Sequence, residues 1–243
     1  MKMNVYEYLA GNEYPGRGIC IGKTLGGNKS MIAYFIMGRS VNSRNRVFES
    51  IEGGICTKAA DPSKMTDPHL IIYNPVLTCR STTIVTNGDQ TDTIRDFLVR
   101  NEFPGFDYEA ALNTRTFEDD KPNWTPRISG VVNMDTGCYK LSMIKSCDGD
   151  EKSVQRFSFD YPEPLAGEGH FISTYKCNGT PLPSFAGEPL HMILDEEDPN
   201  KYAEKIWKAL NDENRVSLFV REVDLATQSY KDVIINKYKA AER

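Results

Sequence analysis

The sequence predicts an α+β fold, a four-layered αββα sandwich in which helices cover the outer faces of two stacked antiparallel sheets. Two observations lead to this prediction: strand-like segments dominate the chain, and turns rather than helices separate almost all of them. The chain has 243 residues, of which 40% are hydrophobic. A chain of this length can bury a large core, so we expect a single domain over residues 1–243.

Two hairpins are the clearest β signals. Gly18–Thr24 and Ser30–Arg39 flank a Gly26-Gly27-Asn28 turn, in which glycine can take positive φ. Arg127–Met134 and Cys138–Ser146 flank a second glycine-containing turn. The other predicted strands are His69–Tyr73, Ser81–Thr86, Ser153–Tyr161, Gly169–Cys177, Arg215–Val223 and Asp232–Tyr238.

Two helices stand out by their apolar periodicity. One begins at Thr91 and the other covers Asn200–Asn211, where Asp198 is a suitable N-cap and Pro199 a suitable first helical residue. A short helical turn is expected at Tyr108–Leu112. The apolar faces are formed by Ile94, Phe97 and Leu98 in the first helix and by Ala203, Ile206, Trp207 and Leu210 in the second.

Composition excludes several classes of protein. The formal net charge of −5 argues against a general nucleic-acid binder. The longest apolar run, residues 31–37, is far shorter than the roughly 18–20 residues that span a bilayer, and the N-terminal segment lacks an apolar signal region. We therefore expect a cytoplasmic protein without membrane contact. Its six cysteines and three histidines show no metal-ligand spacing, so no metal site is expected.

The segment Arg39–Arg46 is the strongest candidate for anion binding. It holds three arginines among small polar residues, directly after the most hydrophobic predicted strand. Guanidinium groups match phosphate oxygens bidentately, so the segment is suited to clamp an anion. A solvated basic loop is the alternative.

Two further segments carry groups able to do chemistry. Thr86–Thr93 reads as a strand, a glycine turn and a helix start, whose free N–H groups are able to hold an anion or a carbonyl oxygen. Its Asp89 and Asp92 equally suit an ordinary capped helix. Residues 106–109 offer Tyr108 and Glu109, which are otherwise ordinary surface residues.

Taken together and in order, these segments resemble the archaeal-type IMP cyclohydrolase family over roughly residues 14–225. The resemblance implies the sandwich fold of the N-terminal-nucleophile hydrolases. It also implies ring closure of 5-formamidoimidazole-4-carboxamide ribotide to inosine 5′-monophosphate (IMP), with loss of water and without a cofactor. The motifs that carry it are Tyr14-Pro-Gly-Arg17, Ala33-Tyr34, Arg39-Ser40, Arg44, Asn74-Pro75, Asn87-Gly88, Thr91-Asp-Thr-Ile94, Asp107-Tyr-Glu109, Thr125-Pro-Arg-Ile128 and Ile172-Ser-Thr-Tyr175.

Residue chemistry and the resemblance together suggest roles for individual side chains. Arg39 and Arg44 bind the phosphate or the developing oxyanion, and Asn87 and Gly88 hold the carboxamide or formyl group. Glu109 is the candidate proton acceptor. Tyr108 lies beside it in the sequence, and the remaining candidate substrate-binding residues are Ser40, Asn74, Asp92, Thr93, Thr125 and Arg127. We expect Arg44, Asn87, Glu109 and Arg127 to converge in one cavity.

Three departures from the family pattern leave other functions open. Arg115–Asn123 reads as an insertion, Cys79 stands where a tyrosine occurs in family members, and the stretch after Pro181 reads as an added lid. One alternative is an N-terminal-nucleophile amidase, which requires cleavage before Cys20. The other is a non-catalytic module that binds purine nucleotides. A purine ribotide is the expected ligand, and a homo-oligomer is compatible with the sequence.

Overall fold

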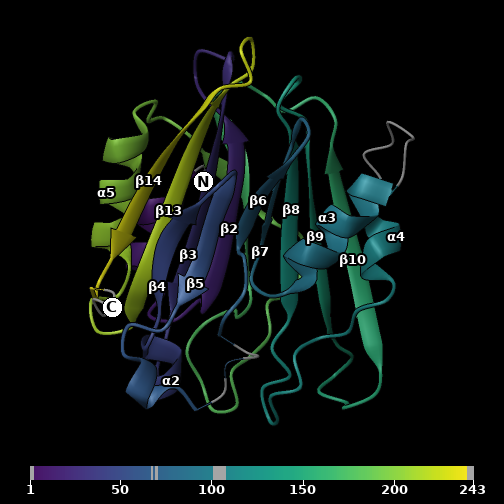
Figure 1. The fold of residues 1–243 in the computed structure, drawn as a ribbon, viewed down its shortest axis with the longest axis vertical. Helices are drawn as coiled ribbons and strands as arrows, with labels where there is room; N and C mark the ends of the chain where they lie inside the picture. The colour runs from purple at the N-terminus through teal and green to yellow at the C-terminus, as the bar shows by residue number, and fades with distance from the viewer. Residues whose placement is uncertain (1–2, 67, 69–70, 101–107, 240–243) are drawn as a thin grey trace.

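Two seven-stranded sheets stack face to face (Figure 1). The structure is a computed structural model, and it describes residues 3–66, 68, 71–100 and 108–239. One buried cluster fills the space between the sheets, and two others join the outer face of each sheet to helices. The αββα layers predicted from the sequence are therefore present, whereas the closer likeness to N-terminal-nucleophile hydrolases stays a prediction.

The first sheet holds the predicted hairpin at its centre, where Gly27 takes a φ of +74° in the turn. Its neighbouring strands are antiparallel except at one edge, where a two-residue strand runs parallel to its neighbour. The strand order is β1 (Met3–Asn4), β12 (Leu190–Ile193), β11 (Glu168–Ser173), β2 (Arg17–Lys23), β3 (Lys29–Met37), β13 (Arg215–Asp224) and β14 (Tyr230–Asn236).

The second sheet is antiparallel throughout its described strands and contains the other predicted hairpin. Gly137 takes a φ of +76° in the turn of that hairpin. The strand order is β10 (Val154–Tyr161), β9 (Tyr139–Ser146), β8 (Arg127–Asn133), β7 (Thr82–Thr86), β6 (Val76–Cys79), β5 (Gly54–Lys58) and β4 (Val47–Ile51).

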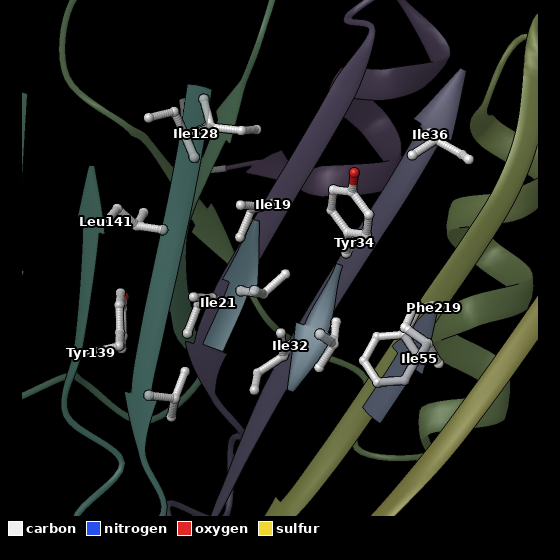
Figure 2. Close-up of a cluster of buried hydrophobic side chains, with 14 of the residues drawn as sticks. Ile19, Ile21, Ile32, Tyr34, Ile36, Ile55, Ile128, Tyr139, Leu141 and Phe219 are labelled. Carbon is white, nitrogen blue, oxygen red and sulfur yellow. The ribbon is translucent and has the colours of Figure 1, made fainter. Parts of the chain in front are cut away.

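Alternate side chains of the central strands form the core between the sheets. Figure 2 shows Ile19 and Ile21 of β2 facing Ile128 of β8 and Leu141 of β9, and all four are fully buried. A Cβ atom on Gly130 of β8 would lie only 2.6 Å from Ile21 Cδ1. Glycine at this position therefore lets the two sheets approach closely, and this contact fixes how they stack.

Helices cover both outer faces. α1 (Val5–Ala10) and α5 (Pro199–Ala209) pack on the first sheet, and α3 (Gln90–Arg100) and α4 (Glu109–Leu112) pack on the second (Figure 1). The Asp198 carboxylate accepts a hydrogen bond from Asn200 N at 2.8 Å, so α5 begins as its sequence predicts. Two short elements lie in loops, α2 (Val41–Arg44) and a 3₁₀ turn (Pro62–Lys64). No described helix is long and apolar enough to cross a membrane.

Some predicted elements differ from those observed. Residues 71–73 form a turn and not a strand, because the Pro68 carbonyl accepts hydrogen bonds from the N–H groups of Ile71 and Ile72. Residues 69–70 of that predicted strand lie outside the described residues. The predicted strand Gly169–Cys177 extends past the end of β11. The sequence prediction missed β1, β4, β5, β6, β12, α1 and α2.

Candidate active site

A cavity of about 250 Å³ lies at the end of the sandwich where β2 begins and β3 ends. Because β2 and β3 form a hairpin, these two ends are neighbours, and α2 lies beside them at the lower end in Figure 1. The loop 113–126 and the segment after β11 complete the walls. The side chains that determine its chemistry are Tyr14, Arg17, Arg39, Ser40, Arg46, Glu118, Asp120 and Tyr175.

Arg39 is the exposed cation of the cavity. Its guanidinium lies 5.1 Å from the centre of the Tyr14 ring, in a cation–π contact. Nη1 donates to Asn178 Oδ1 at 2.7 Å and to Gly179 O at 2.9 Å. These contacts place a positive charge at the cavity mouth, where it is able to meet a ligand phosphate.

Arg46 is the buried cation of the cavity. Its Nε donates to Ser43 O at 2.8 Å and its Nη2 to Met37 O at 3.2 Å. Nη1 is buried and has no hydrogen-bond partner within the described residues. Burial lowers the pKa of the Arg46 guanidinium from its ordinary value, and the positive charge of Arg17 contributes to this shift. A buried donor without a partner is costly, so a ligand oxygen in the cavity would stabilise it.

Glu118 is the buried carboxylate of the cavity, with 4% of the residue exposed. Its Oε2 lies 3.5 Å from Arg17 Nη2, and its Oε1 accepts a hydrogen bond from Asn87 Nδ2 at 3.2 Å. Burial raises the pKa of Glu118, although the charges of Arg17 and Arg127 oppose this effect. A carboxylate with a raised pKa is a better proton acceptor near neutral pH than an ordinary surface carboxylate.

Asp120, Thr125 and Tyr175 form a hydrogen-bonded chain along one wall. Thr125 N and Thr125 Oγ1 lie 2.6 and 2.5 Å from the two carboxylate oxygens of Asp120. The hydroxyl of Tyr175 lies 2.5 Å from Thr125 Oγ1, and its ring stacks on Tyr14 with 6.0 Å between centres. This wall therefore offers aromatic surface together with a fixed hydroxyl group.

The structure brings some predicted site residues to the cavity. Arg39 and Ser40 line it. Asn87 and Thr125 are fully buried behind it, where they bond to Glu118 and to Asp120 respectively. These residues surround one site although they come from distant parts of the sequence.

Gly88 and Arg127 lie next to this group. Arg127 Nη1 donates to Asp89 Oδ1 and to Gln90 Oε1, both at 2.8 Å, and Nε donates to Thr116 O at 2.9 Å. A Cβ atom on Gly88 would lie 2.6 Å from Arg127 Nη1, so glycine leaves room for the guanidinium. Arg127 thus ties the start of α3 to the loop that carries Glu118.

Arg44, in contrast, turns away from the cavity. Its Nε donates to Gly38 O at 2.9 Å, and its Nη2 donates to Asn214 Oδ1 at 3.1 Å and pairs with Glu213 at 3.2 Å. These contacts hold the loop after β3 against the segment before β13. The guanidinium of Arg46, two residues further on, lines the cavity instead.

Tyr108 and Glu109 belong to the outer layer of the second sheet. Tyr108 is buried in the cluster between that sheet and the helices α3 and α4. Glu109, at the start of α4, accepts hydrogen bonds from Ser158 Oγ at 2.6 Å and Lys140 Nζ at 3.4 Å. The expected convergence of Arg44, Asn87, Glu109 and Arg127 in one cavity is therefore wrong, because α4 directs Glu109 away from the space between the sheets.

Asn74, Asp92 and Thr93 also lie apart from the cavity. Asp92 and Thr93 line a separate pocket beside α3. Asn74 Nδ2 donates to Asp92 Oδ1 at 3.4 Å, and the same carboxylate oxygen pairs with Arg95 at 2.7 Å. Asp92 thus stabilises its own helix start, which is the alternative interpretation of the turn before α3.

Sequence reasoning left Arg17, Arg46, Glu118, Asp120 and Tyr175 without roles. Weak signals existed for each: Arg17 and Tyr175 belong to the ordered motifs, and Arg46 to the arginine cluster. Glu118 and Asp120 lie within the presumed insertion 115–123, to which no site residue was assigned. The insertion therefore supplies both carboxylates of the cavity.

Cys20 does not reach the cavity. It is buried in the layer between the first sheet and its helices, and Tyr202 OH donates to its sulfur at 3.5 Å. Burial raises the pKa of the Cys20 thiol to about 12, so it stays protonated and is a poor nucleophile. No cluster of three or more His, Cys, Asp or Glu side chains suited to a metal ion occurs among the described residues.

The fold and the cavity define an αββα sandwich protein with a cavity lined by arginine and carboxylate side chains. Comparison with known proteins identifies the family. A family model described as "IMP cyclohydrolase-like protein" matches residues 14–228, and the chain belongs to this family.

Three relatives named IMP cyclohydrolase show how far the similarity extends. The protein from Methanococcus aeolicus is 30% identical over 190 residues, which cover 77% of this chain and 84% of that protein. The Methanopyrus kandleri protein is 29% identical over 186 residues, or 76% of this chain and 84% of its own length. The Methanococcus maripaludis protein is 29% identical over 222 residues, or 90% and 96% of the two chains.

Proposed function

We propose that this chain is an IMP cyclohydrolase, which closes the ring of 5-formamidoimidazole-4-carboxamide ribotide with loss of water to form IMP. The family match and the names of its relatives support this activity. The observation that best supports the proposal is that the buried carboxylate of Glu118 pairs with the Arg17 guanidinium at 3.5 Å, in a cavity that the buried guanidinium of Arg46 also lines.

The ribotide phosphate requires a cation at the cavity mouth. Arg39 supplies a guanidinium group there, and Ser40 adds a hydroxyl group next to it. The rings of Tyr14 and Tyr175 offer an aromatic wall for the imidazole. With the phosphate held at the mouth, the base of the ribotide extends toward Arg46 and Glu118.

Ring closure needs a proton acceptor and a stabilised oxyanion. The carboxamide nitrogen attacks the formyl carbon, a C–N bond forms, and Glu118 takes one of the two protons from that nitrogen. The formyl oxygen gains negative charge, which the Arg46 Nη1 donor stabilises. Glu118 then gives its proton to this oxyanion, which becomes a hydroxyl group. The hydroxyl group leaves as water together with the proton of the former formamido nitrogen, and the C=N bond of IMP forms between that nitrogen and the former formyl carbon.

This assignment replaces Glu109 by Glu118 as the proton acceptor. Glu109 is bonded to Ser158 and Lys140 on the outer layer, whereas Glu118 lines the cavity. We further propose that residues 1–243 act as one cytoplasmic domain that takes a purine ribotide and no nucleic acid.

A turnover assay tests the proposal. Purified protein is supplied with the formamido ribotide, and IMP formation is followed by chromatography, while thermal unfolding is measured with and without IMP. The proposal requires both IMP formation and a higher midpoint of unfolding with IMP. Stabilisation by IMP without ring closure would instead support a non-catalytic nucleotide-binding module.

A further inference from the structure

The hydrogen bonds that link Asp120, Thr125 and Tyr175 can be donated in only one consistent direction. An ionised carboxylate accepts hydrogen bonds and donates none, so the Thr125 hydroxyl at 2.5 Å donates to Asp120. Thr125 has a single hydroxyl proton and therefore has none left for Tyr175. The contact of 2.5 Å between the two hydroxyl groups is then a bond donated by Tyr175 and accepted by Thr125.

Tyr175 keeps the proton that this direction requires. Burial, above all, raises the pKa of its hydroxyl above the ordinary value. The charge of Arg17 acts in the opposite direction, and the charges of Asp120 and Glu118 act with burial. Because the Tyr175 hydroxyl donates its proton to the bond with Thr125, its oxygen is left only to accept a hydrogen bond from another group.

This oxygen belongs to a residue that lines the same cavity as Glu118, the group proposed to take a proton. Arg17 lines it as well, and the charges of Arg17 and Glu118 both act on the pKa of the Tyr175 hydroxyl. The stacking of Tyr175 on Tyr14 and the full burial of Thr125 leave the hydroxyl little freedom to turn. Its orientation is thus set before a ligand arrives.

We propose that Asp120 and Thr125 orient the Tyr175 hydroxyl so that its oxygen accepts a hydrogen bond from an N–H group of the ligand. This inference deepens the proposed function and rests on it for the identity of the ligand. The carboxamide nitrogen of the ribotide carries two protons: one goes to Glu118, and Tyr175 holds the other. The retained proton is the N1–H of IMP. Tyr175 is then a specificity-determining residue, and Asp120 and Thr125 are positioning residues.

Two nucleotides that differ at the N1 edge of the purine base provide the test. IMP carries the N1–H donor, whereas purine riboside 5′-monophosphate has an unprotonated N1 and no N–H at that edge. We expect the unmodified protein to bind IMP more tightly, as measured by isothermal titration calorimetry. Tyr175→Phe should reduce this preference about three- to tenfold, because the variant loses one neutral hydrogen bond to the N1–H group. Affinity for the second nucleotide should stay within about twofold.

Substitutions of Thr125 test whether it acts through Tyr175. Thr125→Val removes the acceptor and frees the Tyr175 proton to point at the ligand, so the preference for IMP should fall as in Tyr175→Phe. Thr125→Ser keeps the hydroxyl group and should restore the preference. In the Tyr175→Phe background, Thr125→Val should cause no further loss of preference. A purely structural role would weaken both nucleotides equally, and thermal unfolding of each variant checks its folding.

The outcomes separate this inference from the proposed function. Ring closure by the unmodified protein together with an unchanged IMP preference in Tyr175→Phe overturns the inference and leaves the function standing. A lost preference in a protein without ring-closing activity supports the inference and contradicts the function. Failure of the unmodified protein to bind either nucleotide contradicts both.

Discussion

Arg17 at the start of β2 and Glu118 in the loop 113–126 form an ion pair across the cavity wall, with 3.5 Å between Nη2 and Oε2. Both side chains are largely buried, at 12% and 5% exposure. The pair joins the first sheet to a loop of the second. Burial raises the pKa of Glu118, the group proposed to take the proton, and the positive charge of Arg17 opposes this rise.

Replacing Arg17 should change the pH dependence of turnover. Arg17→Met removes a charge that lowers the pKa of Glu118, so that pKa rises. Because Glu118 must be ionised to take a proton, the acidic limb of the kcat profile should move to higher pH by about one unit or more. Arg95→Met, on the exposed face of α3, is the matched control and should leave the limb unmoved. An identical profile for Arg17→Met would remove the pair from the mechanism.

Arg39 should act on the phosphate alone. We expect Arg39→Ala to weaken IMP binding about tenfold, since a hydrogen bond to a charged group contributes about 1.5–3 kcal/mol and exposure reduces this value. Binding of inosine, which has no phosphate, should be unchanged. Titration calorimetry with both compounds checks the difference. Equal losses for IMP and inosine would assign Arg39 to the wall of the cavity and not to phosphate recognition.

His170, a residue of β11, should make stability depend on pH. Burial, and then His191, lower its pKa to about 4, against an ordinary value near 6.5, while Glu168 opposes the shift. Its ring stacks on Tyr161 and bonds to Tyr139. Between these two pH values the unfolded chain binds the extra proton, so the free energy of unfolding falls as pH falls through this window.

Urea unfolding of His170→Asn checks this expectation. Its free energy of unfolding should fall less between pH 7 and pH 5 than that of the unmodified protein. Equal falls in the two proteins would show that His170 does not contribute. His170 lines a separate pocket and not the cavity that contains Arg39 and Glu118. The rate of ring closure at pH 7 should therefore stay within about twofold in a folded variant.

Local patterns predicted the centre of the fold well. β2 and β3 are largely apolar runs that flank a glycine turn, and α5 combines an N-cap with an apolar face, so each is specified by neighbouring residues. β4 and β5 are five residues each and pair across a tight turn at Gly53, so they carry too few alternations to be recognised. β1 has two residues and exists only through its pairing with β12.

The site residues also divide into those that neighbouring sequence predicts and those that depend on distant contacts. Arg39 and Ser40 were predicted because they follow a buried strand directly, and strand ends present side chains at the edge of a sheet. Glu118 was not, because residues 115–123 read as an insertion relative to the family pattern. Its burial depends on Arg17 and Asn87, which are distant in the sequence. Glu109 has suitable chemistry, but the direction of α4 is set by packing on the second sheet.

The rates of IMP formation by Glu118→Gln and by Glu109→Gln decide which of these two carboxylates takes the proton during ring closure. Glutamine keeps the shape of each side chain and removes its ability to take a proton. We expect kcat to fall about 10²- to 10⁴-fold in Glu118→Gln, with IMP affinity within about threefold, and to stay within about twofold in Glu109→Gln. The opposite pattern, full turnover without Glu118 and loss without Glu109, would contradict the account.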